Sequence, residues 1–93
     1  MMTEPTHVDG NAAAGAFAGV VGFDVTTATV KCAACGQITP FAESHVYLRA
    51  PGIVVRCPRC DHVLARLVQT EADAWLDLGG TQSWRIRLPA RGW

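Results

Sequence analysis

Four cysteines stand in two C-x-x-C pairs, and they are all the cysteines of the 93-residue chain. Two such pairs about twenty residues apart are typical of a zinc ribbon, because each tight turn directs two sulfurs at one ion and neither turn can complete a tetrahedron alone. The spacing therefore predicts one structural Zn²⁺ per chain, with four ligands: Cys32, Cys35, Cys57 and Cys60.

The residues beside the two pairs suit tight turns. Gly36 follows the first pair and can adopt the positive φ that such a turn tends to need. Asp61 stands at the matching place after the second pair, and aspartate tolerates this conformation better than most residues do. Pro58, inside the second pair, fits a position that needs no N–H donor. Both pairs are thus predicted to be turns that hold metal ligands.

Other uses of four thiols stay open. A four-sulfur site also accepts iron, and C-x-x-C pairs serve thiol and disulfide redox chemistry. A thioredoxin-type pair needs its first cysteine at a helix N-terminus, whereas residues 36–40 read as a turn followed by a strand. Structural zinc is the leading interpretation, and a rubredoxin-like iron redox protein is an alternative.

Catalysis is not indicated by the residue types. A catalytic zinc keeps three protein ligands and an open position, whereas four thiolates leave no place for water. The local context supports no Ser/His/Asp or Cys/His set, and Asp73 and Asp77 make no convincing acid–base pair. We expect no catalytic residues and no enzyme activity. Of the histidines near the pairs, His45 and His62, the second is close enough to contact the site from outside its ligands, although a surface or packing role is simpler.

The charge balance limits the partners. Eight lysines and arginines offset eight aspartates and glutamates, and four thiolates around Zn²⁺ would add about −2. Tight, general binding of DNA draws on many phosphate contacts and is not expected. The basic residues beside the pairs are instead expected to offset the thiolate charge; they are Lys31, Arg56 and Arg59.

Nucleic-acid binding nevertheless remains an alternative function. Those three basic residues could join an aromatic–basic surface for single-stranded nucleic acid that also includes Tyr47, Arg49, Trp84, Arg85 and Arg87. Strand alternation places Trp84 opposite Arg85 and Arg87, which counts against a shared surface. The alternative is a nucleic-acid-binding ribbon associated with transcription or translation.

The expected location is the cytoplasm. Residues 1–9 contain Glu4 and Asp9 and no lysine or arginine, unlike a secretory signal. The apolar run 12–23 is too short to span a bilayer, so no membrane role is expected. In a reducing compartment, paired C-x-x-C motifs indicate a metal instead of disulfides.

One small domain is predicted over residues 9–93, after a flexible tail at 1–8. Asp9 is a plausible N-cap for a helix over 10–22, which is apolar almost all round. Three glycines on one face of this helix predict a close-packed neighbour, either the sheet or a second copy of the helix: Gly15, Gly19 and Gly22.

The rest of the chain reads as β structure. Strand-like stretches occupy 25–31, 37–41, 45–49, 53–56, 62–70, 74–78 and 83–88, with a turn at 50–53. The fold class is therefore small α+β, an N-terminal helix followed by a zinc-ribbon-type antiparallel β-sheet.

Two of these stretches carry further expectations. In the last one, Trp84, Ile86 and Leu88 alternate inward while Arg85 and Arg87 point outward. In 62–70 both faces are apolar, because one face carries Val63, Ala65 and Leu67 and the other carries Leu64 and Val68.

Several short motifs carry a resemblance to a known family. They are Asp9-Gly10-Asn11, Gly22-Phe23-Asp24-Val25-Thr26, the C-x-x-C-G turn, Val46-Tyr47, Ala50-Pro51-Gly52, Arg56-Cys57-Pro58-x-Cys60 and Trp75-Leu76-Asp77-Leu78. Together they resemble a family of small uncharacterised bacterial proteins, a domain of unknown function with zinc-ribbon character. The resemblance implies the four cysteines as functional residues and no activity. The cysteine turns are also similar to those of rubredoxin, although Asp61 replaces the final glycine.

The apolar helix and the two-faced strand need more cover than so small a domain offers. We therefore expect a protein-interaction module that binds a protein partner or forms a homodimer. The chain by itself could instead bury both faces under its C-terminal strands.

Overall fold

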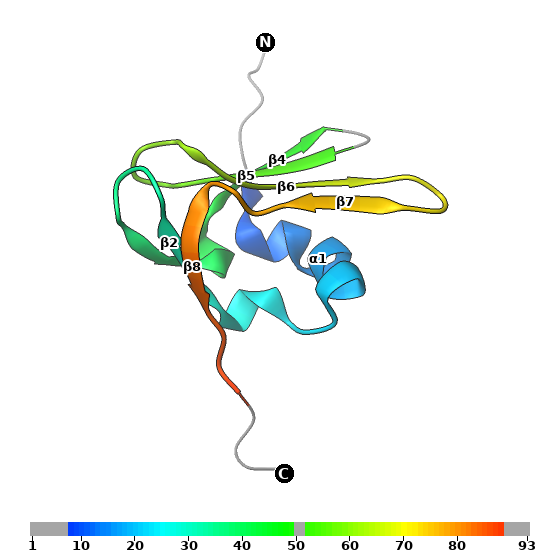
Figure 1. Ribbon diagram of the computed structural model, residues 1–93, viewed down its shortest axis with the longest axis horizontal. Coiled ribbons are helices and arrows are strands. Elements are labelled where there is room, and N and C mark those ends of the chain that lie inside the picture. Colours follow the sequence, from blue (N-terminus) through cyan, green and yellow to red (C-terminus); the bar gives the residue numbers. More distant parts are fainter. Residues whose placement is uncertain (1–7, 50–51, 89–93) are drawn as a thin grey trace.

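Two antiparallel sheets and a few short helical segments make up the protein (Figure 1). The computed structural model describes residues 8–49 and 52–88. The strand order is β1-β4-β5-β6-β7 in the five-stranded sheet and β3-β2-β8 in the three-stranded sheet. The small α+β class is confirmed, but the β structure forms two sheets instead of the single ribbon that was predicted.

The five-stranded sheet consists of β1 (Val8–Asp9), β4 (His45–Arg49), β5 (Gly52–Arg56), β6 (Val63–Gln69) and β7 (Ala74–Asp77). In Figure 1 the helical segments lie on one side of these strands. On the inner face, Val46 and Val55 pair across β4 and β5, and both are buried. On the outer face, Tyr47 pairs with Val54 and Val68 with Trp75, which is 58% exposed. One face of this sheet is thus core and the other is open.

A register shift in the five-stranded sheet overturns the predicted alternation of 62–70. Val55 pairs with Ala65 and Arg56 with Val63, which leaves Leu64 without a residue opposite it. A bulge of this kind lets two successive side chains face the same way. Leu64 and Ala65 are both buried, each about 2% exposed. The strand is therefore less two-faced than its sequence suggested.

The three-stranded sheet consists of β3 (Ile38–Pro40), β2 (Thr29–Cys32) and β8 (Thr81–Arg85). Its strand β2 begins later than predicted, because Val25–Thr27 form a short 3₁₀ helix, η2, that Asp24 caps through the N–H of Thr26. A second 3₁₀ helix, η3 (Phe41–Glu43), leads from this sheet into the other one. Of the predicted turn at 50–53, residues 50 and 51 lie outside the described residues, whereas Gly52 and Ile53 already belong to β5.

The predicted helix over 10–22 is shorter and divided, and a strand precedes it. Asp9, the second residue of β1, accepts from the N–H of Asn11 at 3.0 Å and caps a 3₁₀ helix, η1 (Gly10–Ala13). The α-helix α1 follows over Ala14–Val21 and ends at Gly22, whose φ is 85°. Residues 1–7 of the predicted tail lie outside the described residues, and Val8 is already paired with Val46. Among the described helices, none is long and apolar enough to cross a membrane.

The glycine stripe of α1 has no close neighbour among residues 8–49 and 52–88. A Cβ at Gly15, Gly19 or Gly22 would meet nothing within 4 Å. The helix packs through its other side, where Phe17 is fully buried. The prediction that the sheet packs against these glycines is therefore wrong, and a second copy of the helix at this face stays a prediction.

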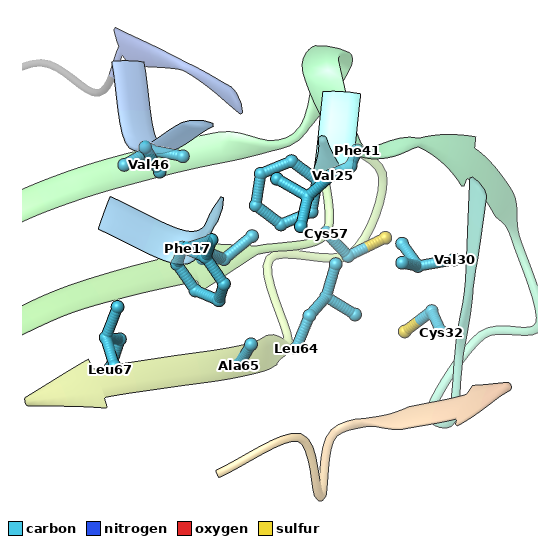
Figure 2. Close-up of a cluster of buried hydrophobic side chains, with 12 residues drawn as sticks. Phe17, Val25, Val30, Cys32, Phe41, Val46, Cys57, Leu64, Ala65 and Leu67 are labelled. Carbon is cyan, nitrogen blue, oxygen red and sulfur yellow. The ribbon is translucent and has the colours of Figure 1, made fainter. Parts of the chain in front are cut away.

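The core lies between the helical segments and the two sheets (Figure 2). Phe41 is its centre, in an edge-to-face contact with Phe17 at 5.3 Å and a tilted contact with Trp84 at 5.6 Å between ring centroids. Trp84 points inward as predicted, but β8 ends at Arg85, and Ile86 and Leu88 are 41% and 68% exposed. The inward alternation therefore stops after Trp84. The partner strand β2 begins at Thr29, which pairs with Arg85, so β2 has no residue to pair with Ile86 or Leu88.

Candidate metal centre

The first cysteine pair forms a hairpin turn between β2 and β3. We call residues 32–37 the first knuckle. Its backbone closes through two hydrogen bonds, from the N–H of Cys32 to the carbonyl of Gln37 at 2.9 Å and from the N–H of Gly36 to the carbonyl of Cys32 at 3.0 Å. The N–H of Ala34 points at the Cys32 sulfur, 3.4 Å away. Gly36 has φ 77°, as its type predicted.

The second pair forms the matching turn between β5 and β6, and we call residues 57–62 the second knuckle. Cys57 donates its N–H to the carbonyl of His62, and Asp61 donates to the carbonyl of Cys57, both at 2.9 Å. The N–H of Arg59 lies 3.4 Å from the Cys57 sulfur. Asp61 has φ 68° and is the only described residue other than glycine with a positive φ.

The two knuckles bring the four sulfurs into one cluster, although they end different sheets. All four Sγ atoms lie within 4.8 Å of one another. The closest cross-knuckle distances are 3.7 Å, from Cys32 to Cys60, and 3.8 Å, from Cys35 to Cys57. A tetrahedron with metal–sulfur bonds of about 2.3 Å has edges of about 3.8 Å. The cluster thus has the size that a tetrahedral metal ion requires.

Each knuckle buries one sulfur ligand and exposes the other. Cys32 and Cys57 are each 1% exposed and belong to the core, and Figure 2 shows them at its end beside Val30 and Leu64. Cys35 and Cys60 are exposed. The first cysteine of each pair therefore connects the site to the core, while the second closes the site toward solvent.

The thiols do not ionise equally well. Burial alone would raise the pKa of Cys32, but the N–H groups of Cys35 and Ala34 and the nearby thiols outweigh it and lower that pKa to about 7. At Cys60 the N–H of His62 favours the thiolate, yet desolvation and the three other thiols outweigh this effect and raise the pKa to about 12. The Cys32 thiolate therefore forms readily, whereas the Cys60 thiolate needs a cation at the centre to form near neutral pH.

The basic residues beside the site have partners other than sulfur. Arg56 donates to the carbonyl of Asp61 at 2.9 Å and lies 3.6 Å from its carboxylate. Arg59 donates to Oε1 of Gln37 at 3.1 Å and so connects the two knuckles. The predicted role of these arginines in offsetting the thiolate charge stays a prediction.

His62 has the surface position expected for it, and only its backbone reaches the site. The His62 side chain is exposed, while its carbonyl accepts from Cys57 and its N–H acts on the Cys60 sulfur. His45 opens β4 and pairs in register with Arg56, one residue before the second knuckle.

Gly80 is the residue at the site that sequence reasoning missed. Its carbonyl accepts from the N–H of Ala33 in the first knuckle at 3.0 Å, and its N–H donates to the carbonyl of Leu64 at 3.2 Å. A Cβ at this position would overlap the backbone of Val63. The Gly79-Gly80 pair signals a turn in the sequence, but only the fold shows that this turn holds the first knuckle against β6, the strand that follows the second knuckle.

The fold and the site define a small α+β protein with four cysteines placed to hold a metal ion. A model of a family of unknown function (DUF6510) matches residues 4–89, and the chain belongs to this family. Comparison with curated proteins and with solved structures gave no significant match. The family brings no activity with it, so the site geometry carries the functional argument.

Proposed function

We propose that the four cysteines bind one zinc ion, whose role is structural, in a zinc-ribbon arrangement. The observation that carries this proposal is the sulfur cluster itself, with cross-knuckle distances of 3.7 and 3.8 Å between hairpin turns of two different sheets. A zinc ion there joins the sheets at one end of the core. Its binding free energy then contributes directly to folding.

The convergence of all four sulfurs, within 4.8 Å of one another, favours one metal ion over a disulfide. A disulfide joins only two sulfurs and does not require four of them at one point. Iron fits a four-sulfur tetrahedron as well as zinc does, so a rubredoxin-like redox site is the competing use of the same ligands. Metal analysis of the purified protein, together with its visible spectrum, separates the two. We expect about one zinc per chain and a colourless protein; one iron per chain and a red ferric form would support the alternative.

We further propose that the protein is not an enzyme. Four thiolates complete the tetrahedron and leave zinc no position for a water or a substrate. The protein instead acts as a small binding module in the cytoplasm, with the metal maintaining the shape of its surfaces.

A protein partner, or a second copy of the chain, is the proposed occupant of the open face of the five-stranded sheet. This face carries Tyr47, Val54 and Val68 next to the exposed Trp75. Aromatic side chains of this kind are common anchors in protein interfaces. Sedimentation of the zinc-loaded protein at micromolar concentration tests self-association: we expect a dimer that Trp75→Ala weakens, with Gln69→Ala as the control.

A monomer would remove the second copy from consideration and leave a different protein as the occupant. Gly19→Leu tests the helix face separately. If the glycine stripe of α1 forms the dimer contact, this variant disrupts the dimer while Trp75→Ala leaves it intact.

A further inference from the structure

Positive charge gathers on the outward face of the three-stranded sheet. Lys31 on β2 and Arg85 on β8 line a groove of about 390 Å³. A smaller hollow of about 30 Å³ contains Arg85 and Arg87. We call Lys31, Arg85 and Arg87 the basic strip. No aspartate or glutamate of the described residues lines either hollow, although the whole chain is neutral.

The strand register places two of these cations on adjacent strands, and the third follows the end of β8. Lys31 pairs with Ser83, and Thr29 pairs with Arg85, so the two cations occupy successive rows on the face opposite the buried Val30. Residues two apart along a strand are separated by about 6.6 Å. Arg87 follows Arg85 by two residues. Lys31 and Arg85 are thus diagonal neighbours on adjacent strands, and the three cations lie along two hollows that share Thr29 and Arg85.

The groove also offers contacts other than charge. Thr29 and Ser83 line it with hydroxyl groups, which donate hydrogen bonds to phosphate oxygens in many nucleic-acid complexes. Ile38 lines its other side and is 63% exposed, so an apolar surface lies beside the cations. Thr27 lines the smaller hollow, and the acidic residue nearest to it in the sequence is Asp24. The Asp24 carboxylate accepts hydrogen bonds from both the N–H and the hydroxyl of Thr26.

We propose that the basic strip binds the phosphate backbone of a single-stranded nucleic acid. Three cations along two adjoining hollows suit a single strand, whereas duplex binding of useful strength draws on more phosphate contacts. The strip lies on the face of a sheet, and none of its residues is on a helix that could enter a duplex groove. Sequence preference is not expected, because the contacts are to phosphate. This function goes beyond the proposed protein interaction and uses the other sheet.

The test is fluorescence anisotropy with a labelled 12-nucleotide oligo(dT) and the zinc-loaded protein at several salt concentrations. Three phosphate contacts predict a slope of about −2 for log K against log salt, from about −0.7 per contact. Arg85→Gln should weaken binding several-fold and reduce the slope by about 0.7. The matched control is Arg66→Gln, which removes the same charge from an exposed arginine of the five-stranded sheet and should change affinity less than about two-fold.

Each further result supports or overturns the proposal. Zinc content and melting curves equal to wild type show that both variants are folded. Equal losses for Arg85→Gln and Arg66→Gln would mean that net charge, and not the basic strip, causes binding. Competition by an oligoglutamate peptide as strong as that by unlabelled oligo(dT) would assign the basic strip to an acidic peptide, and equally strong competition by inorganic phosphate would assign it to a free anion. Tighter binding of a DNA duplex than of oligo(dT) would assign it to a duplex ligand. No binding at all would also overturn it.

Discussion

The first and second knuckles make the same hydrogen bonds with different residues. In each, the first cysteine donates to the carbonyl five residues later and accepts from the N–H four residues later, and its sulfur faces the N–H two residues later. Apart from the cysteines, the two segments share no residue: Ala33-Ala34-Gly36-Gln37 corresponds to Pro58-Arg59-Asp61-His62. The shared backbone is therefore set by the requirement to direct two sulfurs at one point.

The difference between the knuckles lies at the position after the second cysteine. Gly36 adopts its φ of 77° without a side-chain cost. Asp61 adopts φ 68° with a side chain, and Arg56 contacts both its carbonyl and its carboxylate. The second knuckle thus compensates a less favourable residue with a neighbouring arginine, whereas the first needs no compensation.

Removing the metal should have the largest effect, because the exposed hydrogen bond between the knuckles, from Arg59 to Gln37, contributes far less than a shared metal ion. A strong chelator should unfold much of the structure around the knuckles, since apparent zinc-binding free energies of this type are on the order of 10 kcal/mol. Circular dichroism before and after chelation, and again after zinc is restored, measures this loss. A metal-free protein with an unchanged melting curve would show that the two knuckles are stable without a shared ion.

Acid should act in the same direction by replacing the metal with protons. Metal-bound thiols have their ionisation shifted to lower pH, so this stabilisation is present at neutral pH and is lost as the pH falls. In the metal-free protein the pH dependence of stability has opposite signs at Cys32 and Cys60. Cys32, with its pKa lowered to about 7, loses stabilisation as pH falls from about 9 toward 7, whereas Cys60, raised to about 12, loses it as pH rises from about 9 toward 12. Zinc release followed with a chromogenic chelator across a pH series checks the first claim.

Replacing single ligands should lower stability more at the buried sulfurs than at the exposed ones. The two knuckles should not differ from each other in this respect. Cys57→Ser and Cys32→Ser remove ligands that also belong to the core. Each variant should lose zinc, and the buried hydroxyl should lower the free energy of unfolding by a further ~1–2 kcal/mol. Cys35→Ser and Cys60→Ser remove exposed ligands. Zinc content and thermal melts of the four variants provide the comparison. A Cys57→Ser protein with full zinc and a wild-type melt would contradict the four-ligand site.

Gly80→Ala should weaken the connection between the first knuckle and β6. Its new Cβ would overlap the backbone of Val63, and the turn also bonds to Ala33 and Leu64. We expect a loss of about 2 kcal/mol or more in the free energy of unfolding, measured by urea denaturation. Gly79→Ala is the matched control, because its Cβ would meet only a side-chain atom, Oδ1 of Asp77 at 3.0 Å, and no backbone. Equal losses of stability for the two variants would show that Gly80 does not connect the first knuckle to β6 more than its neighbour does.

The smallest effects concern the two positive-φ positions. Gly36→Ala should cost about 1 kcal/mol, because nothing lies within 4 Å of its new Cβ and only the backbone conformation is penalised. Asp61→Gly should change stability by less than about 1 kcal/mol, because relief of the left-handed conformation offsets the lost Arg56 contact and the greater freedom of the unfolded chain. The same denaturation measurement covers both. A large loss for Asp61→Gly would mean that the Arg56 contact organises the second knuckle.

The clustering of the four cysteines was predictable, because C-x-x-C spacing and the turn residues act locally. The division into two sheets was not, since strand patterns around 25–41 and 45–70 do not specify which strands pair. The bulge at Leu64 changed a face assignment that strict alternation had given, and Gly80 acquired its role only from contacts with distant segments. The glycines of α1 predicted a close neighbour, yet their face is open because Phe17 directs the other side inward. Local chemistry was readable from the sequence, whereas long-range pairing was not.

X-ray absorption spectroscopy at the zinc edge tests the central claim most directly, because it counts the ligand atoms around the ion. The two knuckles together predict four sulfur neighbours at about 2.3 Å and no oxygen or nitrogen. Two or three sulfurs with lighter atoms completing the shell would contradict joint binding by Cys32, Cys35, Cys57 and Cys60.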